Sequence, residues 1–231
     1  MLKKCTRLAT RLATKSILRP RPFSGFSFAG PKDLNQILDM DAVKGLNGDE
    51  IASLWKDFHA EKKGTLGWVV EGSVGKLVLH RATTKNCKFF ISPVFQEEKV
   101  AEEGEAEEGA GYYNLIVQFF EPSHFVLANL QDYQADPANA QPVISFSVFD
   151  DYIESKNMTL VRADIIVNVF REGEAEKIIG GILKRFDGRT CDKDWVDIFN
   201  NKPEDFKFEE FIEDSRTAWF GVENKGEGEK E

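Results

Sequence analysis

Strand-like runs in the middle of the chain restrict the possible folds more than any other feature. Period-two or continuous apolar patterns predict strands at 88–95, 112–120, 123–130, 142–149, 159–164 and 165–170. The second and third of these are separated by Glu121-Pro122, so they are expected to form an antiparallel hairpin. Pro93 suits its run to a sheet edge or strand end, because proline cannot donate to a ladder.

Helical periodicity lies on both sides of these runs. It predicts a short helix after Asp33 and further helices at 49–62, 73–84, 150–156, 172–186 and 204–214. Residues 63–72 are too rich in glycine to assign, and 132–141 are expected to be a turn-rich connection. The fold class is therefore α+β, with a largely antiparallel curved β-sheet in the middle of the chain and helices at both ends packing on it. Gly180-Gly181 are expected to allow close packing of their helix against the sheet.

The N-terminus has the composition of an import signal. Residues 1–23 carry seven basic and no acidic residues, with leucines and hydroxyl residues between them, which indicates a mitochondrial presequence cut near Phe23 and a matrix location. A basic disordered tail is the alternative. We then expect a flexible linker (24–32), an N-terminal helical region (33–86), a sheet-plus-helix core domain (87–220) containing an acidic loop (97–111), and a charged tail (221–231).

Charge and hydropathy exclude several kinds of partner. Without residues 1–23, the formal net charge of −9 becomes about −16, and basic residues are scattered among more numerous acidic ones. Binding to nucleic acid or to an anionic membrane surface is disfavoured, because both require clustered lysine and arginine. No uninterrupted apolar run approaches 20 residues, so no membrane insertion is expected.

The residues able to carry chemistry do not form a recognisable motif. His59, His80 and His124 lack metal-ligand spacing, and Cys87 and Cys191 lack a C-x-x-C partner. Gly75-Lys76 falls outside any phosphate-loop spacing. We therefore expect no catalytic residue, no cofactor and no metal. A small matrix hydrolase built on Cys87 or His124 remains the alternative.

The order of several weak motifs carries a resemblance. The motifs are Leu54-Trp55-x-x-Phe58-His59-x-x-Lys62, Cys87-Lys-Phe-Phe-Ile-Ser-Pro-Val, the hairpin 113–129 followed by Leu130-Gln-Asp-Tyr133-Gln134, Asp136–Pro142, and Leu160-Val-Arg-Ala-Asp164. Their order and spacing over residues 33–215 resemble the mitochondrial F1-ATPase assembly factor family of the Atp11 type. Two departures are a longer, more acidic 97–111 segment and Ala163-Asp164 in place of Gly-Glu.

The resemblance implies a non-catalytic matrix chaperone. Such proteins bind the unassembled β subunit of the F1 ATP synthase and keep it soluble until the α subunit displaces them. Aromatic and apolar side chains are the natural contacts for such a client. Our candidate partner-binding residues are Trp55, Tyr112, Ile116 and Phe120, each with a core position as the alternative. A structural subunit of a respiratory complex is a further alternative.

Overall fold

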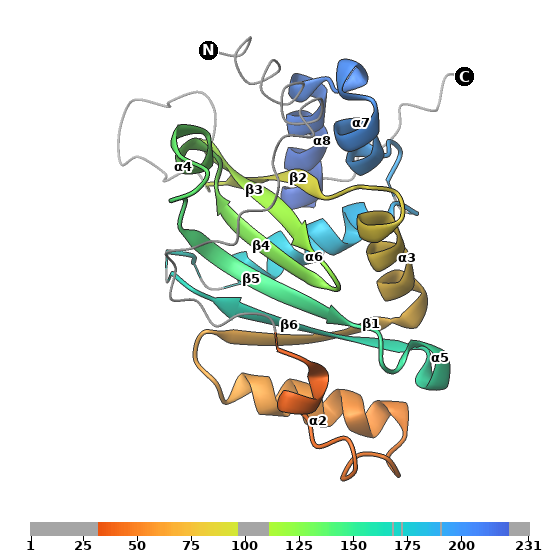
Figure 1. Cartoon of the computed structure of the whole chain (residues 1–231). Coiled ribbons are helices and arrows are strands. Elements are labelled where there is room, and N and C mark those ends of the chain that lie inside the picture. The colour runs from red at the N-terminus through yellow and green to blue at the C-terminus, as the bar shows by residue number, and fades with distance from the viewer. Residues whose placement is uncertain (1–31, 97–110, 168, 172, 190, 222–231) are drawn as a thin grey trace, which may run out of the picture.

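A single six-stranded antiparallel sheet organises the chain (Figure 1). The computed structural model describes residues 32–96 and 111–221 except 168, 172 and 190. The strands are β1 (Thr65–Glu71), β2 (Phe89–Phe95), β3 (Tyr112–Phe120), β4 (His124–Asn129), β5 (Pro142–Phe149) and β6 (Met158–Ile165). Their order across the sheet is β1-β6-β5-β4-β3-β2, and each pair is antiparallel. The presequence, most of the linker, the acidic loop and most of the charged tail lie outside the described residues.

Helices precede, interrupt and follow the strands. They are η1 (Leu34–Gln36), α2 (Gly48–Ala60), α3 (Gly72–Thr83), α4 (Leu130–Ala135), α5 (Ile153–Lys156), α6 (Glu174–Asp187), α7 (Trp195–Asn201), η2 (Pro203–Asp205) and α8 (Phe208–Phe220). The α+β class and the predicted helices α2, α3 and α6 are confirmed. Asn47 begins α2, and its side chain accepts from the Glu50 N–H at 3.0 Å while the Glu50 carboxylate accepts from the Asn47 N–H at 2.8 Å. This reciprocal capping box accounts for the sharp start of the helix.

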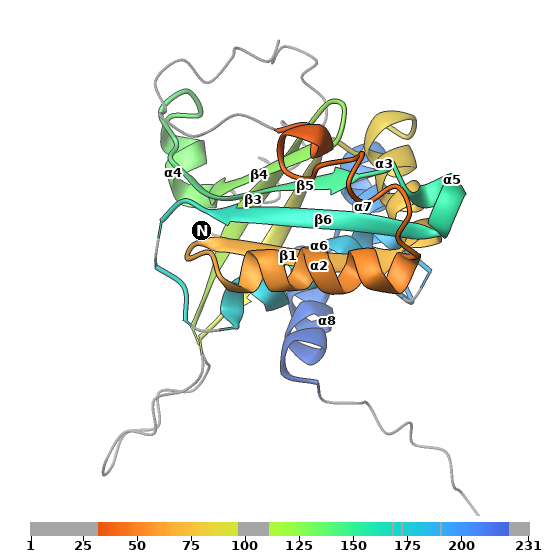
Figure 2. The ribbon, with the colours of Figure 1, turned by 90° about the horizontal axis from the view of Figure 1, so that it is seen from below.

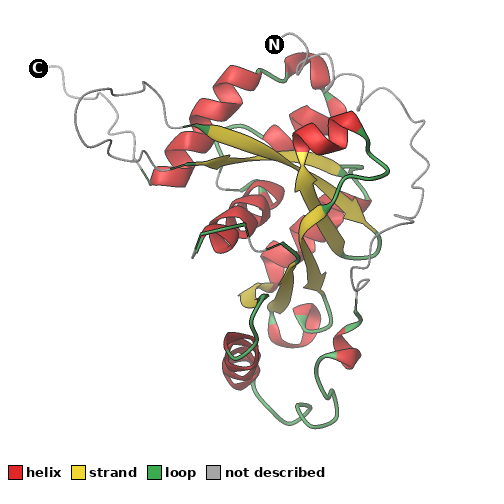
Figure 3. Cartoon of the chain, turned by 90° about the vertical axis from the view of Figure 1, so that its left-hand side faces the viewer, coloured by secondary structure: helices red, strands yellow, loops and turns green. Residues whose placement is uncertain are grey.

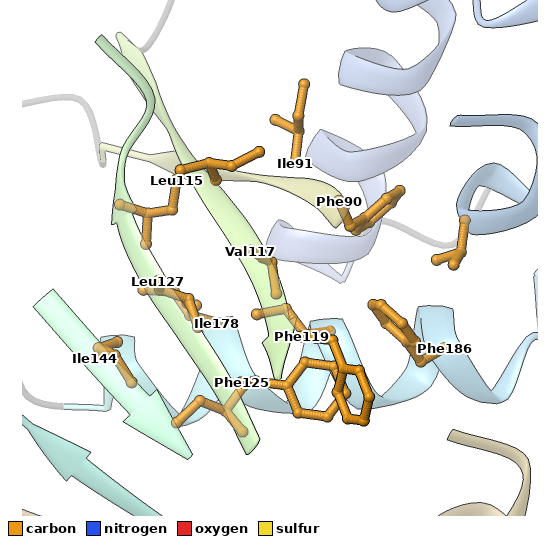
Figure 4. Packing of buried hydrophobic residues seen from close by; sticks show 14 of the residues in the cluster. Phe90, Ile91, Leu115, Val117, Phe119, Phe125, Leu127, Ile144, Ile178 and Phe186 are labelled. Carbon is orange, nitrogen blue, oxygen red and sulfur yellow. The ribbon is translucent and has the colours of Figure 1, made fainter. Parts of the chain in front are cut away.

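One face of the sheet packs against α6, which has α3 and α7–α8 beside it. Phenylalanine dominates this layer: the Phe125 ring stacks on Phe146 with centroids 4.6 Å apart, and its edge meets Phe186 of α6 at 5.3 Å. Phe90 of β2 makes edge contacts with rings from α6, α7 and α8. Figure 4 shows Phe90 and Phe125 on the side of the sheet that α6, with Phe186, covers. The abundance of phenylalanine in the sequence therefore supplies the main core.

The opposite face is covered at its β1 side by α2 and the segment before it (Figure 2). Trp55 is the central residue of this second cluster, and its indole N–H donates to the Val161 carbonyl at 3.1 Å. Ile51, Phe149 and Leu160 complete its buried surroundings. The two faces together make a sheet with a helix layer on each side, strongly twisted as Figure 3 shows.

The first strand lies where the sequence allowed no assignment. β1 pairs with β6 along its whole length, from Thr65 opposite Asp164 to Glu71 opposite Met158. Gly67 lets α2 approach closely, because a Cβ atom there would lie 2.6 Å from Nδ1 of His59. The glycine that obscured the strand pattern is therefore what allows the helix to pack on the strand.

Other predictions need correction. Residues 166–170 do not continue as a strand; the Ile166 and Val167 N–H groups both donate to the Val143 carbonyl and the chain then leaves the sheet. The helix after Asp33 is only a 3-10 turn, the connection 132–141 begins inside α4, and the last helix lies later than 204–214. Gly180 and Gly181 do not pack against the sheet: both are exposed, and a Cβ at either would meet nothing within 4 Å.

Candidate functional site

His124 and Ser147 are the nearest approach to a catalytic pair. His124 Nδ1 lies 2.9 Å from Ser147 Oγ across strands β4 and β5. Both are buried, with 4% and 7% of their surfaces exposed, and burial lowers the pKa of His124 to about 4. A base with this pKa is neutral at pH 7, but the hydroxyl beside it is closed to a substrate. The pair is therefore a buried structural contact between two strands of the sheet.

Cys87 is similarly withdrawn from chemistry. It is buried before β2, and burial raises the pKa of its thiol to about 11. Its sulfur lies 3.6 Å from the Lys85 carbonyl and 3.8 Å from the Asn201 amide nitrogen. Because the thiolate is the reactive species, this environment suppresses nucleophilic attack.

The described part of the chain holds neither a metal cluster nor a membrane-spanning helix. Its histidine, cysteine and carboxylate side chains form no group of three or more that could hold a metal ion. Among its helices, none has the length and apolar character to cross a membrane.

Trp55 and Ile116, two of the predicted partner-binding residues, are core residues in this fold. Trp55 is 1% exposed and is fixed by its hydrogen bond to β6. Ile116 is also buried, in the middle of β3 between Ile91 and Ala128 of the neighbouring strands. Neither side chain offers surface to a partner of the folded protein. Both residues are core positions, which is the alternative that the sequence left open for them.

Tyr112 and Phe120, the other two, occupy opposite ends of β3. They are eight residue steps apart along the strand, which corresponds to roughly 27 Å at about 3.4 Å per residue. Tyr112 is 38% exposed and touches Phe95 with ring centroids 5.6 Å apart, whereas Phe120 is half-buried beside His124. The structure does not bring the four predicted residues into one surface, and it leaves Tyr112 as the exposed member.

Tyr112 belongs instead to a concentration of apolar side chains at one end of the sheet. We call this surface the apolar rim; its members are Tyr112, Tyr113, Val143, Ile166, Val167, Val169, Phe170 and Phe220. In the described part of the chain, the remaining exposed large apolar side chains are Leu54 and Phe58 on α2. Single exposed apolar residues are ordinary, but a gathering of this kind marks an interaction surface.

The rim is formed where strand ends meet. Because the sheet is antiparallel, the start of β3, the start of β5 and the end of β6 lie at the same end of the sheet. The chain after β6 then covers this end of the sheet, and Val169 in it is 63% exposed. A cavity of about 260 Å³ opens between Tyr113, Val143 and Phe170. Phe220, at the end of α8, joins the rim through Phe95, whose ring centroid is 6.0 Å away.

Tyr113 is a polar member of the rim that lies near the start of α6. Burial, with a contribution from the Glu174 carboxylate, raises the pKa of Tyr113 to about 12. Its hydroxyl therefore stays neutral throughout the physiological range. Glu174 accepts a hydrogen bond from the Arg171 N–H at 3.0 Å, which holds the chain turn between the rim and α6.

The sequence did contain a signal for the rim. Residues 165–170 form an apolar run whose pattern predicts a strand. A strand needs a neighbour, and both partners of β6 end at this point, since β1 begins at Thr65 opposite Asp164 and β5 pairs with β6 only as far as Ile165. The run therefore emerges at the sheet end with its apolar side chains exposed, and only the topology reveals this.

The fold and the rim define a small α+β protein with an exposed apolar surface at one end of its sheet. Residues 23–212 match the model of the family described as ATP11 protein. The chain belongs to the ATP11 family, and the resemblance noted in its motifs is confirmed.

A curated relative comes from Danio rerio. This protein, ATP synthase mitochondrial F1 complex assembly factor 1, is 23% identical over 181 residues, which make up 78% of this chain and 55% of the relative. The chain thus spans about half the length of the curated relative it matches.

Proposed function

We propose that this protein is a mitochondrial matrix chaperone for assembly of the F1 sector of ATP synthase. It binds the unassembled β subunit, prevents its aggregation and is displaced by the α subunit. Membership of the ATP11 family and the name of the Danio rerio relative support a role in F1 assembly. The basic, acid-free residues 1–23 support import into the matrix.

The apolar rim is the observation that carries the proposal. A subunit awaiting assembly exposes apolar surface that its finished complex will cover, and a chaperone must cover that surface reversibly. The rim offers aromatic and branched aliphatic side chains that are held at the ends of a rigid sheet. Such a surface binds without any chemical step, and the inaccessibility of Cys87 and His124 favours a function without catalysis over the hydrolase alternative.

Light scattering tests the proposed function. Purified protein comprising residues 24–231 is mixed with isolated F1 β subunit under conditions where β aggregates, with and without α subunit. We expect suppressed scattering that α relieves. Unchanged scattering would refute a β-directed chaperone, whereas permanent stoichiometric association with finished ATP synthase would favour the structural-subunit alternative.

Substitutions at the rim locate the client surface. The double variant Tyr112→Ser/Val169→Ser is expected to lose most of the suppression while its melting temperature changes little, because both side chains are exposed. Leu54→Ser on α2 is the matched control, since it removes a comparable exposed apolar side chain away from the rim. Phe120→Ser tests the other end of β3. If the Leu54 control loses as much suppression of aggregation as the double variant, the rim is not the specific client-binding surface.

A further inference from the structure

A groove crosses the exposed side of α6. One cavity of about 300 Å³ lies between β2, α6 and α8, and a second of about 320 Å³ lies between α6, β1 and α3. The two share Gly180 and Lys184 in their linings. They lie on the two flanks of α6 and border each other at these two residues, apart from the cavity of the apolar rim; we call the two together the groove.

The glycine pair sets the depth of this groove. Gly180 and Gly181 lie inside a helix, where glycine is less favourable than alanine, and a Cβ at either position would have open space around it. Packing among the residues that the structure describes therefore gives no reason for them. Their effect is to lower the helix surface at the point where the two cavities join, so that the main chain of another molecule can approach α6 closely.

The edge strand β2 forms one wall. The Phe89 N–H donates to Asn200 Oδ1 at 3.1 Å and its carbonyl accepts from Asn200 Nδ2 at 2.6 Å, so the outer edge is occupied there by α7. Main-chain groups alternate in direction along a strand, and Ile91 therefore directs its N–H and carbonyl to this same edge, beside the groove. Pro93 follows without an N–H, which limits pairing to a short extended segment.

Basic side chains gather in the first cavity of a chain whose formal net charge is −9, and Asp187, the one carboxylate that lines the second cavity, is paired with Arg189 at 2.6 Å. Lys177, Lys184 and Arg185 all line the first cavity. Arg185 is neutralised by Asp214 at 2.8 Å, and Lys177 lies over the Trp219 ring at 5.6 Å. Within the described residues neither lysine has a carboxylate partner. Two uncompensated ammonium groups over an apolar floor are complementary to an acidic segment.

We propose that this groove binds an extended, acidic segment of the client subunit, with its main chain over Gly180-Gly181 and its carboxylates at Lys177 and Lys184. The inference rests on the proposed function, since it assigns a second contact of the same client. Trp219 connects the two surfaces: it lines the groove and contacts Phe95, which touches Tyr112 of the rim. One client chain can therefore engage both.

The test uses the affinity of fluorescein-labelled protein for isolated F1 β subunit, measured by anisotropy. Lys177→Glu/Lys184→Glu is expected to weaken binding about tenfold. Lys44→Glu/Lys56→Glu, which makes the same charge change on exposed lysines elsewhere, is the control and should bind as the wild type does. Gly180→Gln/Gly181→Gln should also weaken binding while raising the melting temperature by about 2–4 °C, because glutamine favours the helix and fills the groove.

Photo-crosslinking gives a direct readout. A benzoylphenylalanine placed at Ala218, which is exposed and lines the groove, should crosslink to β, whereas one at Ser53 on α2 should not. If both groove variants bind β as tightly as the wild type and position 218 gives no crosslink, the groove proposal is refuted and the proposed function stands. Absence of β binding by the wild-type protein would overturn the proposed function together with the groove.

Discussion

Acid should destabilise this protein through one buried histidine. His124 lies in β4 beside Ser147, and burial lowers its pKa from 6.5 to about 4, with the Asp164 carboxylate opposing the shift. In the unfolded chain the imidazole regains an ordinary pKa. Between pH 6.5 and pH 4 the unfolded state therefore binds a proton that the folded state refuses, and the stability falls as the pH falls.

The size of the effect follows from these two pKa values. Each pH unit between them corresponds to about 1.4 kcal/mol, so the interval gives a loss of about 3 kcal/mol for this residue. Urea unfolding followed by tryptophan fluorescence at pH 7, 6, 5 and 4 measures the free energy of unfolding. Carboxylates also titrate in this range, so the comparison that isolates His124 is with His124→Gln.

The variant is expected to be less stable than the wild type at pH 7, where it loses the native side-chain packing, and to lose less stability on acidification. The difference between the two curves should shrink by about 3 kcal/mol from pH 7 to pH 4. Parallel curves would refute the reasoning, because they would mean that His124 takes up its proton equally well in both states.

Three other predictions concern packing and reactivity. Gly67→Ala should lower the free energy of unfolding by about 1–3 kcal/mol in urea titration, because its Cβ would lie 2.6 Å from the buried His59 ring; Gly45→Ala, with nothing within 4 Å, is the control. Trp55→Phe should cost about 2 kcal/mol by calorimetry, since the indole hydrogen bond and part of the ring are lost, and an unchanged melting temperature would contradict its core role. At pH 8 a thiol reagent followed by mass spectrometry should modify the partly exposed Cys191 and spare Cys87, whose thiol has a pKa of about 11; equal rates would disprove its burial.

Elements with a regular period could be predicted from the sequence, whereas elements that depend on a neighbour could not. α6 has a broad apolar stripe and β5 a clear alternation, so both were expected at nearly their observed positions. β1 carries apolar side chains on both faces around Gly67, since it contacts α3 on one side and α2 on the other. α7 has only seven residues, and its Trp195 and Phe199 are ordered by the ring of Phe211 in α8 and by that of Phe206, which follows η2.

The candidate site was harder to predict than the fold. Trp55 and Val169 are both large apolar residues, and nothing in their types distinguishes a core position from an exposed one. The distinction comes from topology: Trp55 is on the inner face of a helix that packs on β1 and β6, and Val169 lies beyond the point where both partner strands of β6 end. Whether an apolar run is exposed therefore depends on how the strands pair in the finished sheet, and not on the run itself.

The pairing of β1 with β6 also bears on how the chain reaches its native state. Thr65 is opposite Asp164, about a hundred residues later, and every strand between them is joined to its neighbour by shorter connections. Closing so long a loop is entropically unfavourable until the four intervening strands supply a template. We therefore expect β2 to β6 to form first and β1 to add last, together with α2. Until then β6 is an open sheet edge, so the protein is itself prone to aggregation at a late stage of its own folding.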